Sequence, residues 1–143
     1  MISVQAERFP LAEVFTISRG SKAEAAVVTA TVMRNGVSGR GEAVPYARYG
    51  ESLDSVMAQI EGLPEGISRA DLQAALPAGA ARNAVDCALW DLAAKTAGKR
   101  VWEMAGWAAP APEITCYTLS LDTPERMQAA AAAEPARAIA FQG

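Results

Sequence analysis

An asparagine–glycine pair between two runs of extended chain constrains the fold of this sequence most. Glu24–Arg34 reads EAAVVTATVMR, and every second residue from Ala26 to Val32 is a small or β-branched apolar residue. Asn35-Gly36 then supplies two residues that tolerate the positive φ angles of a tight two-residue turn. Val37–Val44 follows as the partner strand. The pattern therefore predicts a β-hairpin with one apolar face.

The remaining strand signals complete a small sheet. Residues 2–9 are predicted to form a first strand, which gives a three-stranded antiparallel arrangement over the first 45 or so residues. Gly39 and Gly41 lie within the third strand. They either weaken it or allow another backbone to approach closely.

A helical block follows the sheet. Ser52 can cap a helix whose apolar residues recur at helical spacing, and Ser68 with Asp71 is typical of the start of a second, short helix. The strongest helix pattern runs over 79–97, with Gly98 placed as its C-terminal stop. A short helical turn over 101–105 is also predicted. The buried stripe of the long helix is expected to contain Ala81, Ala84, Val85, Ala88, Leu89 and Leu92.

Three acidic residues in this block are best explained by helix structure. Asp86 and Asp91 lie five positions apart, so they do not share a helix face and are a poor metal site. Each has a basic residue four positions away, which predicts the ion pairs Arg82–Asp86 and Asp91–Lys95. Glu51 precedes a helix start and is expected to interact with a helix dipole.

After Gly106 the helical patterns give way to a linker and a new strand–helix pattern. The stretch WAAPAPE is a proline–alanine linker, Ile114–Leu121 has the pattern of a strand, and Pro124 follows as a first-turn helix residue. A strand and a helix after an α+β block are how a β/α barrel would begin.

Composition excludes several classes of function. The chain has no histidine, which removes Ser-His-Asp, Cys-His and histidine-ligated zinc chemistry. Cys87 and Cys116 form no CxxC pair and are predicted to be buried, reduced thiols of a cytoplasmic protein. The net charge is −3, and no basic stripe indicates nucleic acid. No apolar run is long enough for a membrane span, and residues 1–10 lack the apolar region of a signal peptide.

Four segments in order carry a family resemblance: ISRGSKAEA (17–25), GEAVPYARYGES (41–52), LPAGAARNAVDCALWDLAAKTAGKRVWEMAG (76–106) and CYTLSLDTPERM (116–127). Together they resemble the muconate-lactonising branch of the enolase superfamily, and within it the dipeptide epimerases of the L-Ala-D/L-Glu type. The resemblance implies an α+β fold, with an N-terminal capping domain over 1–106. Residues 107–143 would then be a linker and the incomplete start of a (β/α)7β barrel.

In such enzymes, lysines on barrel strands move a proton α to a carboxylate, and Mg²⁺ held by barrel carboxylates stabilises the enolate. A complete barrel takes about 250 residues. This chain has no lysine after Lys99 and lacks the Lys-x-Lys strand that the family would show just past Ala136. It is therefore expected to be a fragment, or a reading frame that diverges near Ala136. It is also expected to bind no metal and to be inactive alone.

The resemblance implies roles for five residues. Arg19 follows the first strand, in a loop that would reach the distal carboxylate of a substrate, and guanidinium geometry suits that role. Tyr46, Arg48 and Tyr49 could line a pocket for a small peptide. Thr118 would lie at the active-site end of the first barrel strand. The alternatives stay open: a solvated arginine, tyrosines packed within their own loop, and a threonine chosen for strand propensity.

Two other interpretations of the chain remain. It could be a non-catalytic remnant or a partner-dependent half of a split protein of the superfamily. It could also derive from a muconate cycloisomerase or an o-succinylbenzoate synthase, although PYARYGES and the Ser-Arg-Gly segment favour the epimerase. The resemblance implies a small dipeptide as substrate of the complete enzyme and leaves homo-oligomers possible. An isolated barrel strand would be poorly ordered, pair with another copy, or dock on the capping sheet.

Overall fold

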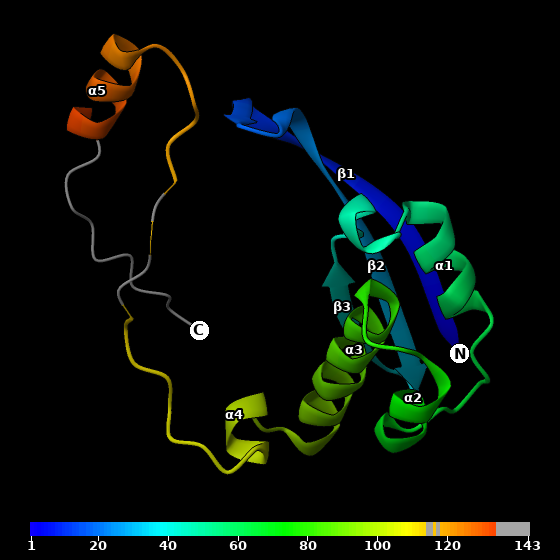
Figure 1. Cartoon of the computed structure of the whole chain (residues 1–143). Helices are drawn as coiled ribbons and strands as arrows, with labels where there is room; N and C mark the ends of the chain where they lie inside the picture. Colours follow the sequence, from blue (N-terminus) through cyan, green and yellow to red (C-terminus); the bar gives the residue numbers. More distant parts are fainter. Residues whose placement is uncertain (114–115, 117, 134–143) are drawn as a thin grey trace. The chain divides into compact units, whose positions relative to one another are not determined.

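The computed structural model describes residues 1–113, 116 and 118–133 (Figure 1). Three strands come first: β1 (Ile2–Ile17), β2 (Gly20–Arg34) and β3 (Val37–Ala43). A 3-10 helix, η1 (Ala47–Tyr49), follows. The helices are α1 (Leu53–Glu61), α2 (Arg69–Ala75), α3 (Ala80–Ala97), α4 (Val101–Met104) and α5 (Pro124–Ala133).

The strands form one sheet in the order β1-β2-β3. The predicted hairpin is confirmed: β2 and β3 are antiparallel, with Arg34 opposite Val37 on either side of the turn. Asn35 and Gly36 have φ angles of 51° and 78°, as a primed two-residue turn requires. At the start of β1, Met1 and Met33 exchange backbone hydrogen bonds of 3.2 and 2.9 Å, the pattern of an antiparallel pair.

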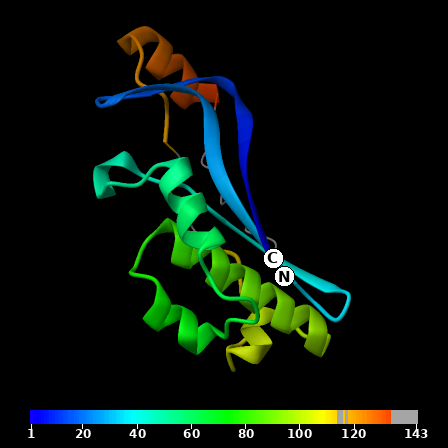
Figure 2. The ribbon, with the colours of Figure 1, turned by 90° about the vertical axis from the view of Figure 1, so that its right-hand side faces the viewer.

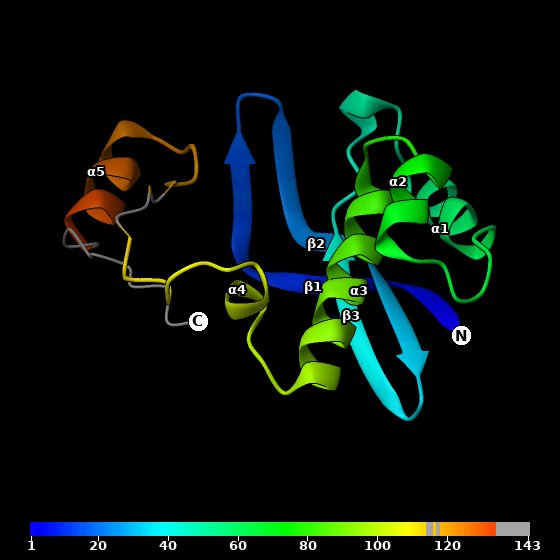
Figure 3. The same cartoon turned by 90° about the horizontal axis from the view of Figure 1, so that it is seen from below.

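The first strand is longer than predicted. The first strand was expected to end at Phe9, yet β1 continues to Ile17, and β2 starts at Gly20 (Figure 3). Pro10 lies inside β1, where its missing N–H is tolerated because β1 is an edge strand of the sheet. Pairing with β2 thus extends a segment that has no clean apolar alternation of its own.

Helices α1 to α4 belong with β3, the first part of β1 and the last part of β2 in one compact unit, made of Met1–Arg8 and Ala26–Trp107. In that unit α3 lies along β3 and makes the main helix–sheet contact (Figure 2). The six predicted stripe residues of α3 are all buried, and they pack with Val28, Ala30 and Val32 of β2. Val27 and Thr29, on the other face of β2, are buried too.

The helix ends follow the predicted capping signals. The Ser52 side chain accepts the Ser55 N–H at 3.1 Å, and the Ser68 side chain accepts the Asp71 N–H at 3.1 Å. Gly98 ends α3 with a left-handed φ of 62°, as expected of a glycine C-terminal stop.

One predicted ion pair forms and the other does not. Lys95 Nζ lies 2.6 Å from Asp91 Oδ2, as predicted. Arg82 instead donates to the Leu76 carbonyl, and Asp86 pairs with Arg69 of α2 at 3.0 Å. Asp86 thus pairs across two helices in place of the local pair, and the Arg69 guanidinium also lies over the ring of Trp90, at 3.7 Å.

Asp91 connects α3 to the sheet. Its carboxylate also accepts the backbone N–H of Arg40 in β3 at 2.8 Å. Partial burial acts to raise the pKa of Asp91, but the hydrogen bonds from Lys95 and Arg40 outweigh it and hold that pKa below its ordinary value. A carboxylate with a lowered pKa in the folded state stabilises the fold above its ordinary pKa, and that contribution disappears as the pH falls through the lowered value.

We therefore expect Asp91→Asn to reduce the free energy of unfolding by about 1 kcal/mol at pH 7. The difference from the wild type should begin to shrink as the pH falls below the ordinary pKa of an aspartate, about 4, and should disappear as the pH passes through the lowered pKa of the folded state. Urea titrations from pH 7 to pH 2 measure it, with Glu65→Gln in the loop before α2 as the control. A constant difference across that range would contradict the assignment.

The second unit contains Phe9–Ala25 and the described residues from Ala108 onward. Helix α5 forms as predicted at Pro124. The predicted strand over 114–121 is wrong for the residues that can be checked. Cys116 and Thr118–Leu121 are not in a strand, and positions 114, 115 and 117 lie outside the described residues. The domain boundary near residue 106 stays a prediction.

The two thiols were also predicted to be buried, and this is wrong: both cysteines are free and exposed. Cys87 lies in α3 between Asp86 and Ala88 and does not belong to the buried stripe. In the part of the chain that the structure describes, no helix is both long and apolar enough to cross a membrane.

Candidate functional site

The loop between β3 and α1 carries three of the five predicted site residues. It is closed by its own backbone: the Tyr46 carbonyl accepts the N–H of Tyr49 at 2.9 Å and the N–H of Glu51 at 3.3 Å. Gly50, which ends η1, has a left-handed φ of 75°, a conformation that glycine adopts at little cost. The local sequence therefore favours a tight, defined loop.

The structure brings Tyr46 and Tyr49 together. Their ring centroids are 6.4 Å apart with the planes at 76°, an edge-to-face pair. The two residues are 52% and 75% exposed, so their rings are not packed away inside the loop. Arg48 lies between them in η1 and is also exposed. The side chains are thus available to a ligand, and their role in binding stays a prediction.

Glu51 does more than the sequence predicted. It was expected to interact with the dipole of a nearby helix, and the structure assigns it to the start of α3, a distant one. Its Oε1 accepts the N–H of Ala80 at 2.6 Å, while its Oε2 accepts the N–H of Tyr46 at 3.1 Å. No sequence signal links position 51 to position 80, since the contact exists only once the loop and α3 have folded together.

Arg19 and Thr118 belong to the second unit. Arg19 lies in the two-residue turn between β1 and β2, beside Gly20 with its φ of 138°, and it is exposed. Thr118 is exposed as well. Ser120 lies two residues after Thr118, and Thr16 lies three residues before Arg19. The Ser120 hydroxyl accepts the Thr16 N–H at 2.9 Å.

A second backbone bond strengthens this connection, because the Leu121 N–H donates to the Thr16 carbonyl at 2.8 Å. The segment after Thr118 is thus fastened to the strand that leads into the Arg19 turn. This contact corresponds to the alternative in which the segment docks on the capping sheet. The five site residues thus fall into two groups, with Tyr46, Arg48 and Tyr49 in the first unit and Arg19 and Thr118 in the second.

A polar network covers the centre of the sheet. Glu7 accepts hydrogen bonds from the buried Thr29 hydroxyl and from Arg40, whose guanidinium lies 2.5 Å away. The Thr29 bond, with the Arg40 charge, holds the pKa of Glu7 below its ordinary value despite opposing desolvation. The network pairs one carboxylate with its own cation, so it acts as a crosslink between strands.

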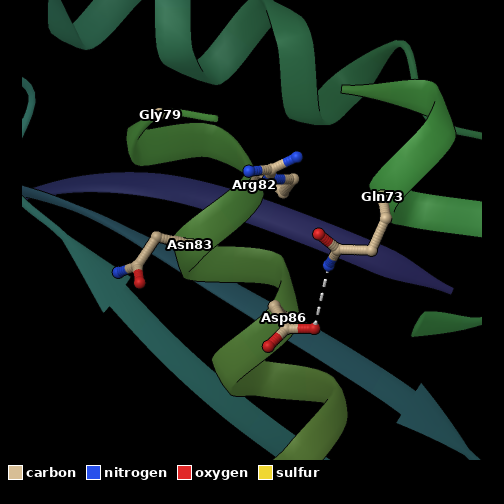
Figure 4. Close-up of a pocket in the computed structure, with 5 residues that line it drawn as sticks. All are labelled: Gln73, Gly79, Arg82, Asn83 and Asp86. Carbon is tan, nitrogen blue, oxygen red and sulfur yellow. Dashed lines mark hydrogen bonds between the residues drawn. The ribbon is translucent and has the colours of Figure 1, made fainter. Parts of the chain in front are cut away.

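A small open pocket of about 260 Å³ lies at the start of α3 (Figure 4). It is lined by Gln73, Gly79, Arg82, Asn83 and Asp86. The polar side chains are engaged within the chain: Gln73 donates to Asp86 at 3.5 Å, and Asn83 donates to the Glu42 carbonyl at 3.4 Å. None of the predicted site residues lines this pocket.

The family resemblance implies Mg²⁺, which takes oxygen ligands, several of them carboxylates. Among the described residues there is no group of three or more Asp, Glu, Cys or His that could hold a metal ion. Glu51, the acidic residue of the β3–α1 loop, accepts two backbone hydrogen bonds. The described residues therefore do not fit a magnesium site.

Comparison with known proteins assigns the chain to a protein family. Residues 1–106 match the model of the mandelate racemase/muconate lactonizing enzyme N-terminal domain. The chain belongs to the mandelate racemase/muconate lactonizing enzyme family. The predicted resemblance is confirmed, and the sheet with its helices is the capping domain that it implied.

Relatives of this family that resemble the chain include L-Ala-D/L-Glu epimerase of Escherichia coli, 47% identical over 88% of this chain and 40% of its own length. An enolase family member from Agrobacterium tumefaciens with homology to dipeptide epimerases, solved with sodium and L-Ala-L-Glu, is 47% identical with a TM-score of 0.85. The match covers 92% of this chain and 42% of that one.

A dipeptide epimerase of Methylococcus capsulatus, complexed with Mg and L-Arg-D-Lys, is 30% identical with a TM-score of 0.77. Here 93% of this chain and 41% of that chain are covered. The chain therefore spans about two fifths of the length of the relatives it matches in this family.

Proposed function

We propose that this chain is the capping portion of a dipeptide epimerase of the L-Ala-D/L-Glu type. It supplies loops that select the substrate, while the residues that move the α-proton lie elsewhere. The observation that carries the proposal is the 47% identity, over most of this chain, to L-Ala-D/L-Glu epimerase and to a relative solved with L-Ala-L-Glu.

The geometry of the loops supports their proposed role. A dipeptide that ends in glutamate presents a side-chain carboxylate and an α-carboxylate at its acidic end. The exposed Arg19 guanidinium can bind one of them with two parallel hydrogen bonds. Ser120 and Leu121 connect the strand before the Arg19 turn to the segment that contains Thr118. That connection would restrict where Arg19 and Thr118 meet a ligand.

The tyrosine pair has a separate role in this proposal. Tyr46 and Tyr49 expose two rings in edge-to-face contact on a tight loop. Aromatic rings offer large, rigid contact areas that lose little conformational entropy on binding. In the complete enzyme they would cover the part of the dipeptide away from the reacting carbon, with Arg48 as an additional cation at the rim.

Mg²⁺ enters this proposal only through the complete enzyme. The Methylococcus relative is complexed with Mg, and the described residues of this chain offer no carboxylate cluster to hold the ion. The sequence also has no lysine after Lys99. The metal and the proton-transferring lysines would therefore come from a barrel portion, in the same polypeptide or in a second one.

This proposal predicts two opposite results in one assay. Incubated with L-Ala-D-Glu and Mg²⁺ in D₂O, the 143-residue chain alone should not exchange the α-proton of the substrate, as followed by proton NMR. A chimera in which the chain, joined within α5, replaces the matching part of the Escherichia coli relative should exchange it. Exchange by the isolated chain, after removal of host enzyme, would contradict the proposal.

The chimera also tests the role of Arg19. Losing one charge-assisted pair costs about 1.5–3 kcal/mol, so Arg19→Met should raise KM by roughly 10- to 100-fold. Lys99→Met, which removes a cation just after α3, is the matched control and should leave KM unchanged. Equal effects of the two substitutions would exclude a specific role for Arg19. A folded but inactive chimera would favour the alternative of a non-catalytic remnant.

A further inference from the structure

We propose that Glu51 is a positioning residue. It holds the Tyr46–Tyr49 loop in one conformation by bonding it to the first turn of α3. The consequence for substrate selection rests on the proposed function, whereas the bonding itself does not.

The carboxylate of Glu51 has two bonds to segments far apart in sequence. One oxygen accepts the N–H of Tyr46 at the start of the loop, at 3.1 Å, and the other accepts the N–H of Ala80 in α3, at 2.6 Å. Both donors are backbone groups, so the two bonds fix the course of the main chain. Hydrogen bonds to an ionised acceptor are roughly twice as strong as those between neutral groups.

Helix α3 needs such a partner. The first N–H groups of a helix have no acceptor within it, and the positive end of the helix dipole favours an anion there. The residue before α3 is Gly79, which has no side chain and provides no capping bond. Glu51 therefore replaces the missing cap. Because α3 has 18 residues and its buried stripe packs in the core, it gives the loop a rigid support.

The loop depends on this support at one end. Tyr46 accepts the N–H groups of Tyr49 and Glu51 through its carbonyl, so Tyr46 is the residue on which the loop closes. Its own N–H is held by the Glu51 carboxylate. If that bond is lost, the closed loop keeps its internal bonds but can move as a body on its two flanking segments. The exposed ring pair would move with it.

Gly79 leaves the space that the carboxylate occupies. A Cβ atom at this position would lie 2.7 Å from Glu51 Oε1. The backbone of Gly79 is extended, with φ of 164°, so an alanine could adopt it without strain. Gly79→Ala should thus displace the carboxylate and leave Glu51 itself in the chain. It is a second, independent way to break the same contact.

Amide hydrogen exchange of the 143-residue chain, measured by NMR, tests the proposal directly. Glu51→Gln keeps the shape of the side chain but has one acceptor oxygen in place of two, so at least one of the bonds is lost. We expect exchange at Tyr46 or Ala80 to accelerate by about 10- to 100-fold. Gly79→Ala should accelerate exchange at both Tyr46 and Ala80. The NMR signals of the Tyr46 and Tyr49 rings and of the neighbouring backbone should broaden.

Glu61→Gln, an equally conservative change of an exposed glutamate in α1, is the control and should leave these amides unaffected. A purely stabilising role for Glu51 would accelerate exchange throughout α3, including Ala88 and Leu89 at its centre. That result would overturn the proposal. Unchanged exchange at both Tyr46 and Ala80 in the two variants would overturn it as well.

The outcome is separable from that of the proposed function because no substrate is present in the exchange experiment. In the chimera, Glu51→Gln should raise KM and leave kcat nearly unchanged, since a mobile loop weakens binding without altering the reacting groups. If amide exchange at Tyr46 or Ala80 accelerates but KM does not change, the tyrosines lie outside the substrate site, and the positioning role of Glu51 still holds.

Discussion

Gly41→Ala should reduce the free energy of unfolding of the chain by about 3 kcal/mol, at the upper end of what overpacking costs. Gly41 lies in β3 directly beneath α3. A Cβ atom there would be 2.6 Å from the backbone nitrogen of Ala88 and 2.8 Å from the Cβ of Cys87. Since a backbone atom cannot rotate away like the end of a side chain, the helix would have to separate from the sheet.

A small domain is stabilised by only about 5–15 kcal/mol in total, so this loss should be plain in a urea titration as an earlier midpoint. Gly62→Ala is the matched control. Gly62 ends α1 in a right-handed helical conformation, and a Cβ there would be 3.5 Å from its nearest neighbour, an ordinary contact. The Gly62→Ala substitution should leave the free energy of unfolding unchanged or raise it slightly. Equal midpoints for Gly41→Ala and the wild type would mean that α3 does not lie this close to β3.

Leu72→Ala should cost about 3 kcal/mol, within the range measured for truncating fully buried leucines. Leu72 is fully buried, at 0% exposed, and it is the buried residue of the seven-residue helix α2. A helix this short has little stability of its own, so its attachment depends on this side chain and on the Arg69–Asp86 pair with α3. Removing the side chain leaves a cavity beside the core.

Urea titration again measures the effect, and exchange at the amides of α2 should accelerate more than exchange within α3. The control is Leu121→Ala. Leu121 is 50% exposed, and the substitution keeps its backbone N–H, which donates to the Thr16 carbonyl, so the same chemical change should alter stability by less than about 0.5 kcal/mol. A comparable loss in both variants would show that Leu72 is not the anchor of α2.

Local signals in the sequence were sufficient for most of the capping domain. The Asn35-Gly36 turn, the serine caps and the Gly98 stop involve residues within a few positions of one another, and all of them formed as predicted. The buried stripe of α3 was also predicted correctly, because helical periodicity determines which residues share a face. The family followed from four motifs in order, since each is a contiguous pattern in the sequence.

The candidate site was less accessible from sequence. Arg19, Tyr46, Arg48, Tyr49 and Thr118 were proposed through the family resemblance, and their roles remain predictions. What holds their segments was not foreseen: Glu51 bonds to Ala80, and Ser120 bonds to Thr16. These contacts join residues 29 and 104 positions apart, and no local pattern encodes such a pairing.

The sequence by itself determined the β2–β3 hairpin, the serine caps of α1 and α2, and the extent and Gly98 stop of α3, since these depend on φ preferences, periodicity and neighbouring side chains. Only the tertiary structure decided how far β1 extends past Pro10 and which partner each charge takes. It also decided which of the two explanations of Gly39 and Gly41 applies, the close approach of a helix backbone. The physical reason is that strand pairing, ion pairing and close packing depend on which distant groups arrive at hydrogen-bonding or van der Waals distance.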